Sequence, residues 1–357
     1  MSNIRINNIT NKTGNTGPVV AGVSTVSSST FMIIPSGNVE IRGGGSGRAI
    51  FCGGYPPSIV NTKDMLTIQS TGDSQDFGDL PRATSEMGGF ASATRGFTAG
   101  GYTPSYVNNI NFVTFSSSGG ANDFGDMTER TWGTNCLANS TRGIIMGGRA
   151  HTDDNPYNGG YMDRILFIEM ASQGQDTSFF GNLIPYSNLG LTGGQTGTLT
   201  GATYASTTRG IVAGGGTPRT KVIQFITIAT KGNAQNFGEL TQEASRVTGF
   251  SSPTRGISAG GFNNGSPSAV KTNIMEFVTI ATLGNSTDFG DLLTQRYSPG
   301  SGSDQTRGVV AGGHTQPGFA NAIEFVTIPS TGDATDFGDL TQARMTSGSS
   351  DSHGGLG

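Results

Sequence analysis

The segments Arg307-Gly-Val-Val-Ala-Gly-Gly313, Ile323-Glu-Phe-Val-Thr-Ile328 and Asp336-Phe-Gly-Asp-Leu340 are the last copies of three phrases that recur along the chain. The first phrase begins at Arg48, Arg95, Arg142, Arg209, Arg255 and Arg307, with intervals of 47, 47, 67, 46 and 52 residues. The Phe-Gly of the third phrase begins at Phe77, Phe124, Phe180, Phe237, Phe289 and Phe337. A fixed period of this length indicates an array of one supersecondary unit.

The second phrase has the composition of a β-strand that is buried on both faces. Ile323 and Phe325 point to one side of such a strand, and Val326 and Ile328 point to the other. A turn residue stands four positions before most of the repeated Phe residues: Asp73, Asp176, Asn233, Asn285 and Asp333. Each unit is therefore predicted to contain several short strands joined by tight turns, without a helix.

Units of this length with a Gly-Gly doublet after an apolar strand are typical of β-propeller blades. Residues 47–357 resemble Kelch repeats, although Phe replaces the downstream Tyr and Trp of that family and Trp132 is the only tryptophan. We predict an all-β fold, a six-bladed Kelch-like β-propeller of residues 47–357 with an extended N-terminal arm of residues 1–46.

The end of the chain predicts how the ring closes. In four repeats the Phe of Phe-Gly lies 18 residues before the next repeated Arg, as in 77 to 95 and 289 to 307. Adding 18 to 337 gives 355, two residues before the last residue, 357. We expect Thr341–Ser352 to complete a blade begun by residues 47–54, which removes free sheet edges.

Composition excludes several classes of protein. Glycine supplies 58 of 357 residues, about 16% against a usual 7% or so, and the repeats place much of it at turns and in the doublets. The net charge of −4 offers no basic surface for nucleic acid. No apolar run is long enough for membrane insertion, and the N-terminus predicts no cleaved signal peptide. Cys52 and Cys136 are expected to be free, buried thiols.

The repeated polar residues are interpreted as structural. Asp-Phe-Gly would hold magnesium in a kinase, but here it recurs without a phosphate-binding loop. We interpret it as a turn with Phe between blades and carboxylates capping amides; calcium binding by Asp73, Asp76 and Asp79 stays open. The repeated Arg residues are expected to pair with Phe-Gly-Asp carboxylates. No metal-ligand or nucleophile spacing is present, so we expect no catalytic residue, no cofactor and no enzyme.

The loops after the Gly-Gly doublets differ most among the repeats, and propeller symmetry brings them to one face. Such loops are either ordinary connections or a binding surface on a constant framework. The candidate ligand or receptor residues are Tyr55, Tyr102, Tyr106, Asp153, Asp154, Tyr157, Phe262, Asn263 and His314.

Taken together, the three phrases, the segment Asn11-Lys-Thr-Gly-Asn-Thr-Gly-Pro18 and the ending Ser352-His-Gly-Gly-Leu-Gly357 resemble Kelch-like structural proteins of marine tailed phages, cyanophages especially. The resemblance implies a virion protein, synthesised in the host cytoplasm, in a tail-associated position or as a surface fibre or knob for host contact. Residues 1–46 would bind other virion proteins, and the chain would be a homo-oligomer in the particle. The candidate anchoring residues are Ile6, Val19, Val20, Phe31, Ile33 and Ile34. The alternatives are an adhesin for host polysaccharide or lipopolysaccharide and a capsid decoration protein without a ligand.

Overall fold

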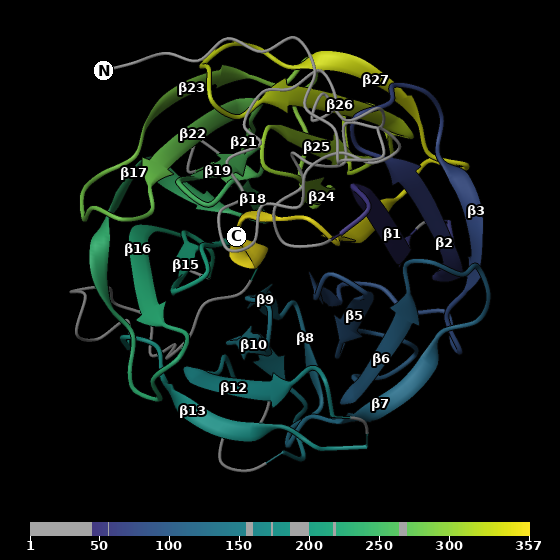
Figure 1. Ribbon diagram of the computed structural model, residues 1–357, viewed down its shortest axis with the longest axis vertical. Helices are drawn as coiled ribbons and strands as arrows, with labels where there is room; N and C mark the ends of the chain where they lie inside the picture. The colour runs from purple at the N-terminus through teal and green to yellow at the C-terminus, as the bar shows by residue number, and fades with distance from the viewer. Residues whose placement is uncertain are drawn as a thin grey trace, which may run out of the picture. The chain divides into compact units, whose positions relative to one another are not determined.

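The computed structural model describes residues 45–55, 57–154, 160–172, 174–185, 200–216, 219–263 and 270–357. These residues form seven antiparallel sheets, six of which lie around a central axis as blades (Figure 1). The predicted six-bladed β-propeller is therefore confirmed. The predicted arm lies outside the described residues except for its last two, Gly45 and Ser46.

Each blade has four principal strands, which are given below in order from the innermost strand to the outermost. They are called the first, second, third and outermost strand of the blade. Blade 1 contains β28 (Met345–Ser350), β1 (Arg48–Tyr55), β2 (Val60–Thr67) and β3 (Gln75–Asp79); blade 2 contains β4 (Gly88–Ala91), β5 (Arg95–Ala99), β6 (Asn109–Thr114) and β7 (Asn122–Asp126). Blade 3 contains β9 (Asn135–Ala138), β10 (Arg142–Met146), β12 (Arg164–Glu169) and β13 (Ser178–Asn182); blade 4 contains β14 (Ala202–Ala205), β15 (Arg209–Ala213), β16 (Thr220–Thr227) and β17 (Gln235–Ser245). Blade 5 contains β18 (Thr248–Ser251), β19 (Arg255–Ala259), β22 (Ile274–Thr279) and β23 (Thr287–Asp291); blade 6 contains β24 (Gly300–Ser303), β25 (Arg307–Ala311), β26 (Ala322–Thr327) and β27 (Thr335–Asp339).

Short elements complete the described fold. The strands β8 (Thr131–Trp132) and β11 (Arg149–Ala150) pair with each other, while β20 (Phe262–Asn263) and β21 (Val270–Lys271) extend the sheet of blade 4. The chain ends in a single 3₁₀ turn, η2 (Gly354–Leu356).

The three repeated phrases occupy the same strands in every blade. The Arg-Gly phrase forms the second strand, the aromatic phrase the third, and Phe-Gly the outermost strand. Phe-Gly is therefore not the turn that the sequence suggested. Its Phe is buried, as predicted, in all six blades. The innermost strands carry small residues such as Gly88 and Ser303, because six strands converge there.

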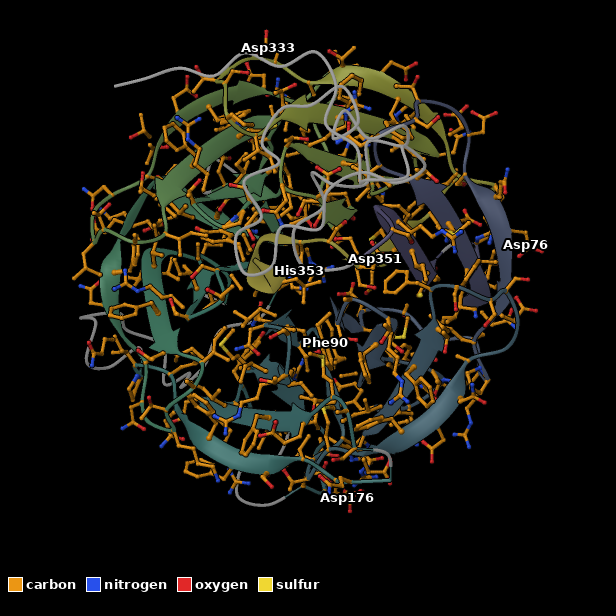
Figure 2. All side chains as sticks on the ribbon, in the orientation of Figure 1. Asp76, Phe90, Asp176, Asp333, Asp351 and His353 are labelled. Atoms are coloured by element: carbon orange, nitrogen blue, oxygen red, sulfur yellow. The ribbon has the colours of Figure 1, made fainter. Side chains whose placement is uncertain are left out.

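The two ends of the chain close the ring in blade 1, as predicted. β28 pairs with β1 in antiparallel register, with Ala49 opposite Ser350. Asp351 reinforces this closure, because its carboxylate accepts hydrogen bonds from the backbone N and Oγ of Ser46 at 2.7 Å each and from the backbone N of Arg48 at 2.9 Å. In Figure 2, Asp351 and His353 lie near the axis, whereas Asp76, Asp176 and Asp333 lie at the perimeter.

Apolar side chains fill the spaces between blades. Ile323 of blade 6 belongs to a buried cluster that includes Phe51 of blade 1. Val326 and Ile328 belong to another cluster, which includes Phe250 of blade 5. The prediction that this strand is buried on both faces is confirmed. Full burial of each such side chain is worth about 1.5–3 kcal/mol.

The repeated arginines link each blade to the next, but not through carboxylates as expected. Each guanidinium donates to a backbone carbonyl just after the third strand of the following blade. The six bonds run from Arg48 to Phe115, Arg95 to Met170, Arg142 to Ile228, Arg209 to Ile280, Arg255 to Ile328 and Arg307 to Ile68. Five of these guanidiniums also lie over the Phe of their own third strand, as Arg307 does over Phe325 at 4.3 Å. The Phe-Gly-Asp carboxylates lie on the outermost strand, with the third strand between them and the arginine strand.

A second set of bonds joins the outermost strands around the perimeter. The backbone N of Gly332, in the hairpin of blade 6, donates to the carbonyl of Phe289 in blade 5 at 2.7 Å. The side chain of Asp333 accepts from the backbone N of Asp291 at 3.0 Å. The equivalent side chains at Asp73, Asp176, Asn233 and Asn285 do the same, so these turn residues cap backbone amides of the neighbouring blade. The capping expected for the carboxylates of Asp-Phe-Gly is seen at Asp76, whose Oδ1 accepts from the backbone N of Gly78 at 2.9 Å.

The glycine of Phe-Gly permits this close approach. Gly290 has φ +140°, and a Cβ there would lie 2.4 Å from the carbonyl oxygen of Gly332 in the next blade. At Gly284, φ is +154° and a Cβ would meet no atom within 4 Å. Both glycines thus adopt a backbone conformation that is unfavourable for other residues. Only at Gly290 would a side chain also collide with the neighbouring blade.

We predict that Gly290→Ala destabilises the propeller by at least about 1 kcal/mol more than Gly284→Ala. Both variants carry the backbone penalty, so the difference isolates the contact between blades. Denaturant unfolding of the two variants measures it. Equal losses of unfolding free energy would show that the approach of Gly332 does not restrict position 290.

We also predict a pH dependence from His353, whose Nε2 lies 2.9 Å from the Ala91 carbonyl and whose Nδ1 accepts from the backbone N of Gly355. Burial lowers the pKa of His353 below its usual 6.5. The unfolded chain therefore takes up this proton first as the pH falls, and stability is lost from about pH 6.5 down to the lower folded pKa. The Tm of the wild type should fall more between pH 7.5 and 5.5 than the Tm of His353→Gln. Parallel Tm profiles would contradict this role.

Candidate functional site at the mouth of the central channel

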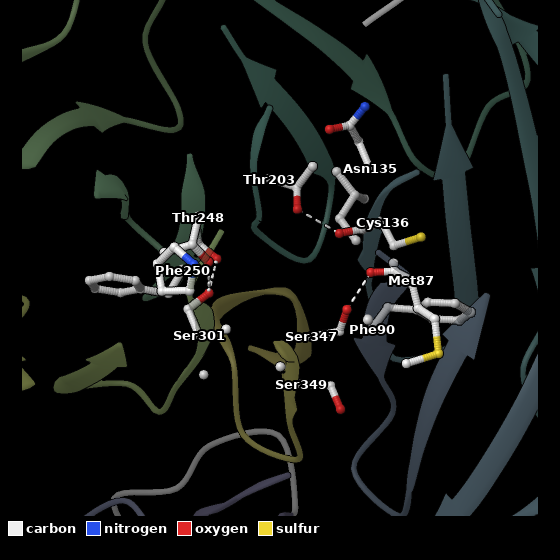
Figure 3. A pocket seen from close by; sticks show the side chains of 18 of the residues that line it. Met87, Phe90, Asn135, Cys136, Thr203, Thr248, Phe250, Ser301, Ser347 and Ser349 are labelled. Atoms are coloured by element: carbon white, nitrogen blue, oxygen red, sulfur yellow. Dashed lines mark hydrogen bonds between the residues drawn. The ribbon is translucent and has the colours of Figure 1, made fainter. Parts of the chain in front are cut away.

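The innermost strands surround a narrow channel of about 170 Å³. Hydroxyl groups on these strands bond to carbonyls of adjacent blades: Thr203 to Cys136 at 2.7 Å, Ser251 to Ala205 at 2.9 Å and Ser350 to Ser303 at 2.8 Å. Figure 3 shows the channel wall, including the Thr203 bond and the bond between Thr248 and Ser301. These hydroxyls link neighbouring innermost strands around the channel.

The C-terminal turn lies against one end of the channel wall. His353 bonds to Ala91 of blade 2, and Gly355 packs so closely on Ala138 of blade 3 that a Cβ would lie 2.0 Å from its carbonyl oxygen. Gly354 makes the same kind of approach to Ser252, just after the innermost strand of blade 5. The turn thereby ties three blades together at this end.

A second cavity adjoins the channel and shares Ser85, Glu86, Arg246 and Met345 with it. We call it the mouth cavity; its volume is about 410 Å³, within the usual range of small-molecule sites. Its lining is Tyr55, Ile59, Ser85, Glu86, Tyr102, Tyr106, Trp132, Arg246 and Met345. Tyr55 and Tyr102 are 41% and 40% exposed.

Three predicted residues, Tyr55, Tyr102 and Tyr106, therefore line this cavity. Tyr106 contacts three other rings: Tyr102 at 6.1 Å, Trp132 at 6.1 Å and His151 at 5.5 Å between centroids. The indole nitrogen of Trp132 is buried and has no hydrogen-bond partner among the described residues. Loops of blades 2 and 3 thus build one aromatic wall.

Two further predicted residues, Phe262 and His314, belong to an adjacent aromatic group centred on Tyr297. Tyr297 stacks between Phe262 at 4.2 Å and His314 at 4.8 Å. Phe319 continues the group from His314 at 4.4 Å to Tyr55 at 6.1 Å. Tyr297 was not among the predicted residues, because it lies before an innermost strand and not in a loop after a Gly-Gly doublet. Phe319 does lie in such a loop, after Gly312-Gly313, but it was not singled out there.

The other predicted residues that the structure describes make contacts outside the lining of the mouth cavity. The carboxylate of Asp154 accepts two side-chain bonds and one backbone bond from Arg130, at 2.7, 3.1 and 2.6 Å, and Asp153 lies 3.7 Å from the same guanidinium. Partial burial would raise the pKa of Asp154, but the Arg130 contacts hold it below its usual value. Asn263 donates to Gln242 at 3.0 Å. Tyr157 lies outside the described residues.

An ion pair at the mouth was also missed. Nη1 of Arg246 lies 2.7 Å from Oε1 of Glu86, and both residues have φ +55°. Each stands nine residues after the Phe of a Phe-Gly, from 77 to 86 and from 237 to 246, as Ser298 does from 289. That constant spacing in the sequence could have indicated that these residues occupy equivalent positions in their blades.

Other chemistry has little support among the described residues. Cys52 and Cys136 are free and buried, as predicted, and burial raises the pKa of these thiols to about 11 and about 12. Within the described ranges, no three His, Cys, Asp or Glu side chains group as a metal site, including at Asp73, Asp76 and Asp79. The same ranges contain no helix that is long and apolar enough to cross a membrane.

Comparison with known proteins supports the fold. No protein-family model and no curated protein sequence matches the chain. Among solved structures, the one described as "Structure of YjhT" is similar, with a TM-score of 0.62 over 80% of this chain and 96% of that chain. The two sequences are 11% identical, so this likeness concerns the propeller fold alone.

Proposed function

We propose that this chain is a non-enzymatic virion protein of a tailed phage, and that its propeller contacts the host by binding a surface glycan in the mouth cavity. The observation that carries the proposal is the aromatic lining of this cavity, with Tyr55 and Tyr102 exposed at its edge. Aromatic rings offer a flat apolar surface to the C–H face of a sugar, while a few convergent polar groups fix its orientation.

The polar groups of the cavity favour binding over hydrolysis. Glycosidases normally require two carboxyl groups on either side of the scissile bond. Glu86 is the one carboxylate in the cavity lining of the described structure, and it is paired with Arg246. A glycan would therefore be held there without the usual acid and nucleophile.

The location in a virion rests on the repeat resemblance and on residues 1–46, which precede the propeller in the sequence. In this proposal residues 1–46 bind other virion proteins, and several copies of the chain are present in the particle, either associated with the tail or as a fibre or knob. A decoration protein without a ligand is the competing function, and glycan binding separates the two.

We predict that the isolated full chain binds host surface polysaccharide and that Tyr102→Ala lowers its affinity at least tenfold by removing one exposed ring. Phe179→Ala is the matched control, because Phe179 is a 54% exposed aromatic on the outermost strand β13. A host glycan array and titration calorimetry measure the effect. Absence of binding to every host glycan would favour the decoration protein.

We further predict that deletion of residues 1–46 leaves a folded propeller that is no longer incorporated into phage particles. Circular dichroism and thermal unfolding check the fold, and immunoblotting of purified particles checks incorporation. Normal incorporation of the truncated chain would refute attachment through residues 1–46.

A further inference from the structure

We infer that the ligand of the mouth cavity is an uncharged sugar residue, recognised by the Glu86–Arg246 pair. This inference rests on the proposed function and adds the chemical class of the ligand. It predicts discrimination between neutral sugars and their acidic counterparts, which glycan binding alone does not.

The ion pair lies across the mouth, between opposite blades. Adjacent innermost strands follow one another around the ring in the order β28, β4, β9, β14, β18 and β24. Glu86 precedes β4 and Arg246 precedes β18, so three blade steps separate them in either direction. Their side chains are 16% and 27% exposed, which leaves both within reach of a ligand in the cavity.

A strained polar network holds this pair. Glu86, Thr200, Arg246 and Ser298 all have positive φ, between +49° and +55°, before the innermost strands of four blades. The Thr200 hydroxyl accepts from the backbone N of Arg246 at 3.2 Å, and the Ser298 hydroxyl accepts from Nη1 of Arg246 at 3.3 Å.

The same position in blade 3 is Gly133, which adopts φ +68° at little cost. Four blades nevertheless carry side chains there, although a residue other than glycine pays about 1–2 kcal/mol in this conformation. Strain of this kind concentrates at binding sites. Here the strained positions hold the guanidinium of Arg246 beside the carboxylate of Glu86.

The charges of the cavity balance. Its described lining contains one acid, Glu86, and one base, Arg246, bonded to each other. The carboxylate of an acidic sugar would be attracted by Arg246 but repelled by Glu86. A cation would be attracted by Glu86 but repelled by Arg246. Two neighbouring sugar hydroxyls suit both groups, because one can donate to the carboxylate while the other accepts from a remaining guanidinium N–H.

The exposed rings of Tyr55 and Tyr102 complete the match. They present apolar faces at the edge of the cavity, while the ion pair supplies hydrogen bonds at its junction with the channel. A pyranose has one apolar face and a rim of hydroxyls, so a neutral hexose satisfies both features without leaving a charge unpaired.

The test compares methyl glucoside, galactoside and mannoside with the corresponding uronic acids on the full chain, using titration calorimetry and saturation-transfer NMR. We expect at least one neutral glycoside to bind at least tenfold more tightly than its uronic acid. Glu86→Gln leaves Arg246 without its counter-charge, so the preference should be lost or reversed. Added salt should weaken uronic acid binding to this variant and leave neutral binding unchanged.

Glu239→Gln is the matched control. Glu239 lies on the outermost strand β17 and forms an exposed ion pair with Lys221, so this variant also removes one carboxylate from an ion pair. It should keep the wild-type preference. Tighter binding of uronic acids by the wild type, or an unchanged preference in a folded Glu86→Gln variant, would overturn the inference while leaving glycan binding intact. Absence of binding to both sugar classes would overturn the inference, and absence of binding to every host glycan on the array as well would overturn the proposed glycan binding.

Discussion

The structure depends on hydrogen bonds that pass from one blade to the next at three distances from the axis. Ser and Thr hydroxyls reach carbonyls of the adjacent blade along the innermost strands, as Ser251 does to Ala205. The arginines of the second strands reach carbonyls after the third strands, and hairpin amides reach the outermost strands. In the arginine set and the hairpin set every blade is both donor and acceptor, so these two sets form closed rings, and each blade is bonded to both of its neighbours.

These contacts between blades explain why the sequence is rich in glycine and poor in charged residues. The blade interfaces combine apolar side chains with hydrogen bonds from hydroxyls, backbone amides and one repeated arginine per blade, so few charged residues are needed. Glycine is required where a neighbouring backbone approaches, as at Gly290, or where the chain reverses after a strand. The low charge and the high glycine content of the sequence thus have one common cause, the contact of sheets with sheets around a ring.

The repeats predicted the architecture well because spacing and hydrophobic alternation are local properties of the sequence. The 18-residue interval predicted the closure of blade 1, and the alternation of Ile323 and Val326 predicted two buried faces. The arginine partners were predicted wrongly, because they depend on how one blade lies against the next. The Glu86–Arg246 pair was not predicted at all, since its members are 160 residues apart and meet only across the ring. Among the loop residues predicted for one face, Tyr55, Tyr102 and Tyr106 line the mouth cavity, whereas Asp153, Asp154 and Asn263 do not.

The clasp of Asp351 on Ser46 and Arg48 has a mechanical consequence. Tension transmitted through residue 45 along the strand direction enters the propeller at β1, which is flanked by β28 on one side and β2 on the other. The backbone hydrogen bonds of β1 to β28 and to β2 are then loaded together in shear. They are not broken one after another, as they would be by a force perpendicular to the strands. Entry through the second strand of a blade would suit the proposed role, in which the chain bears load between a virus particle and a host surface.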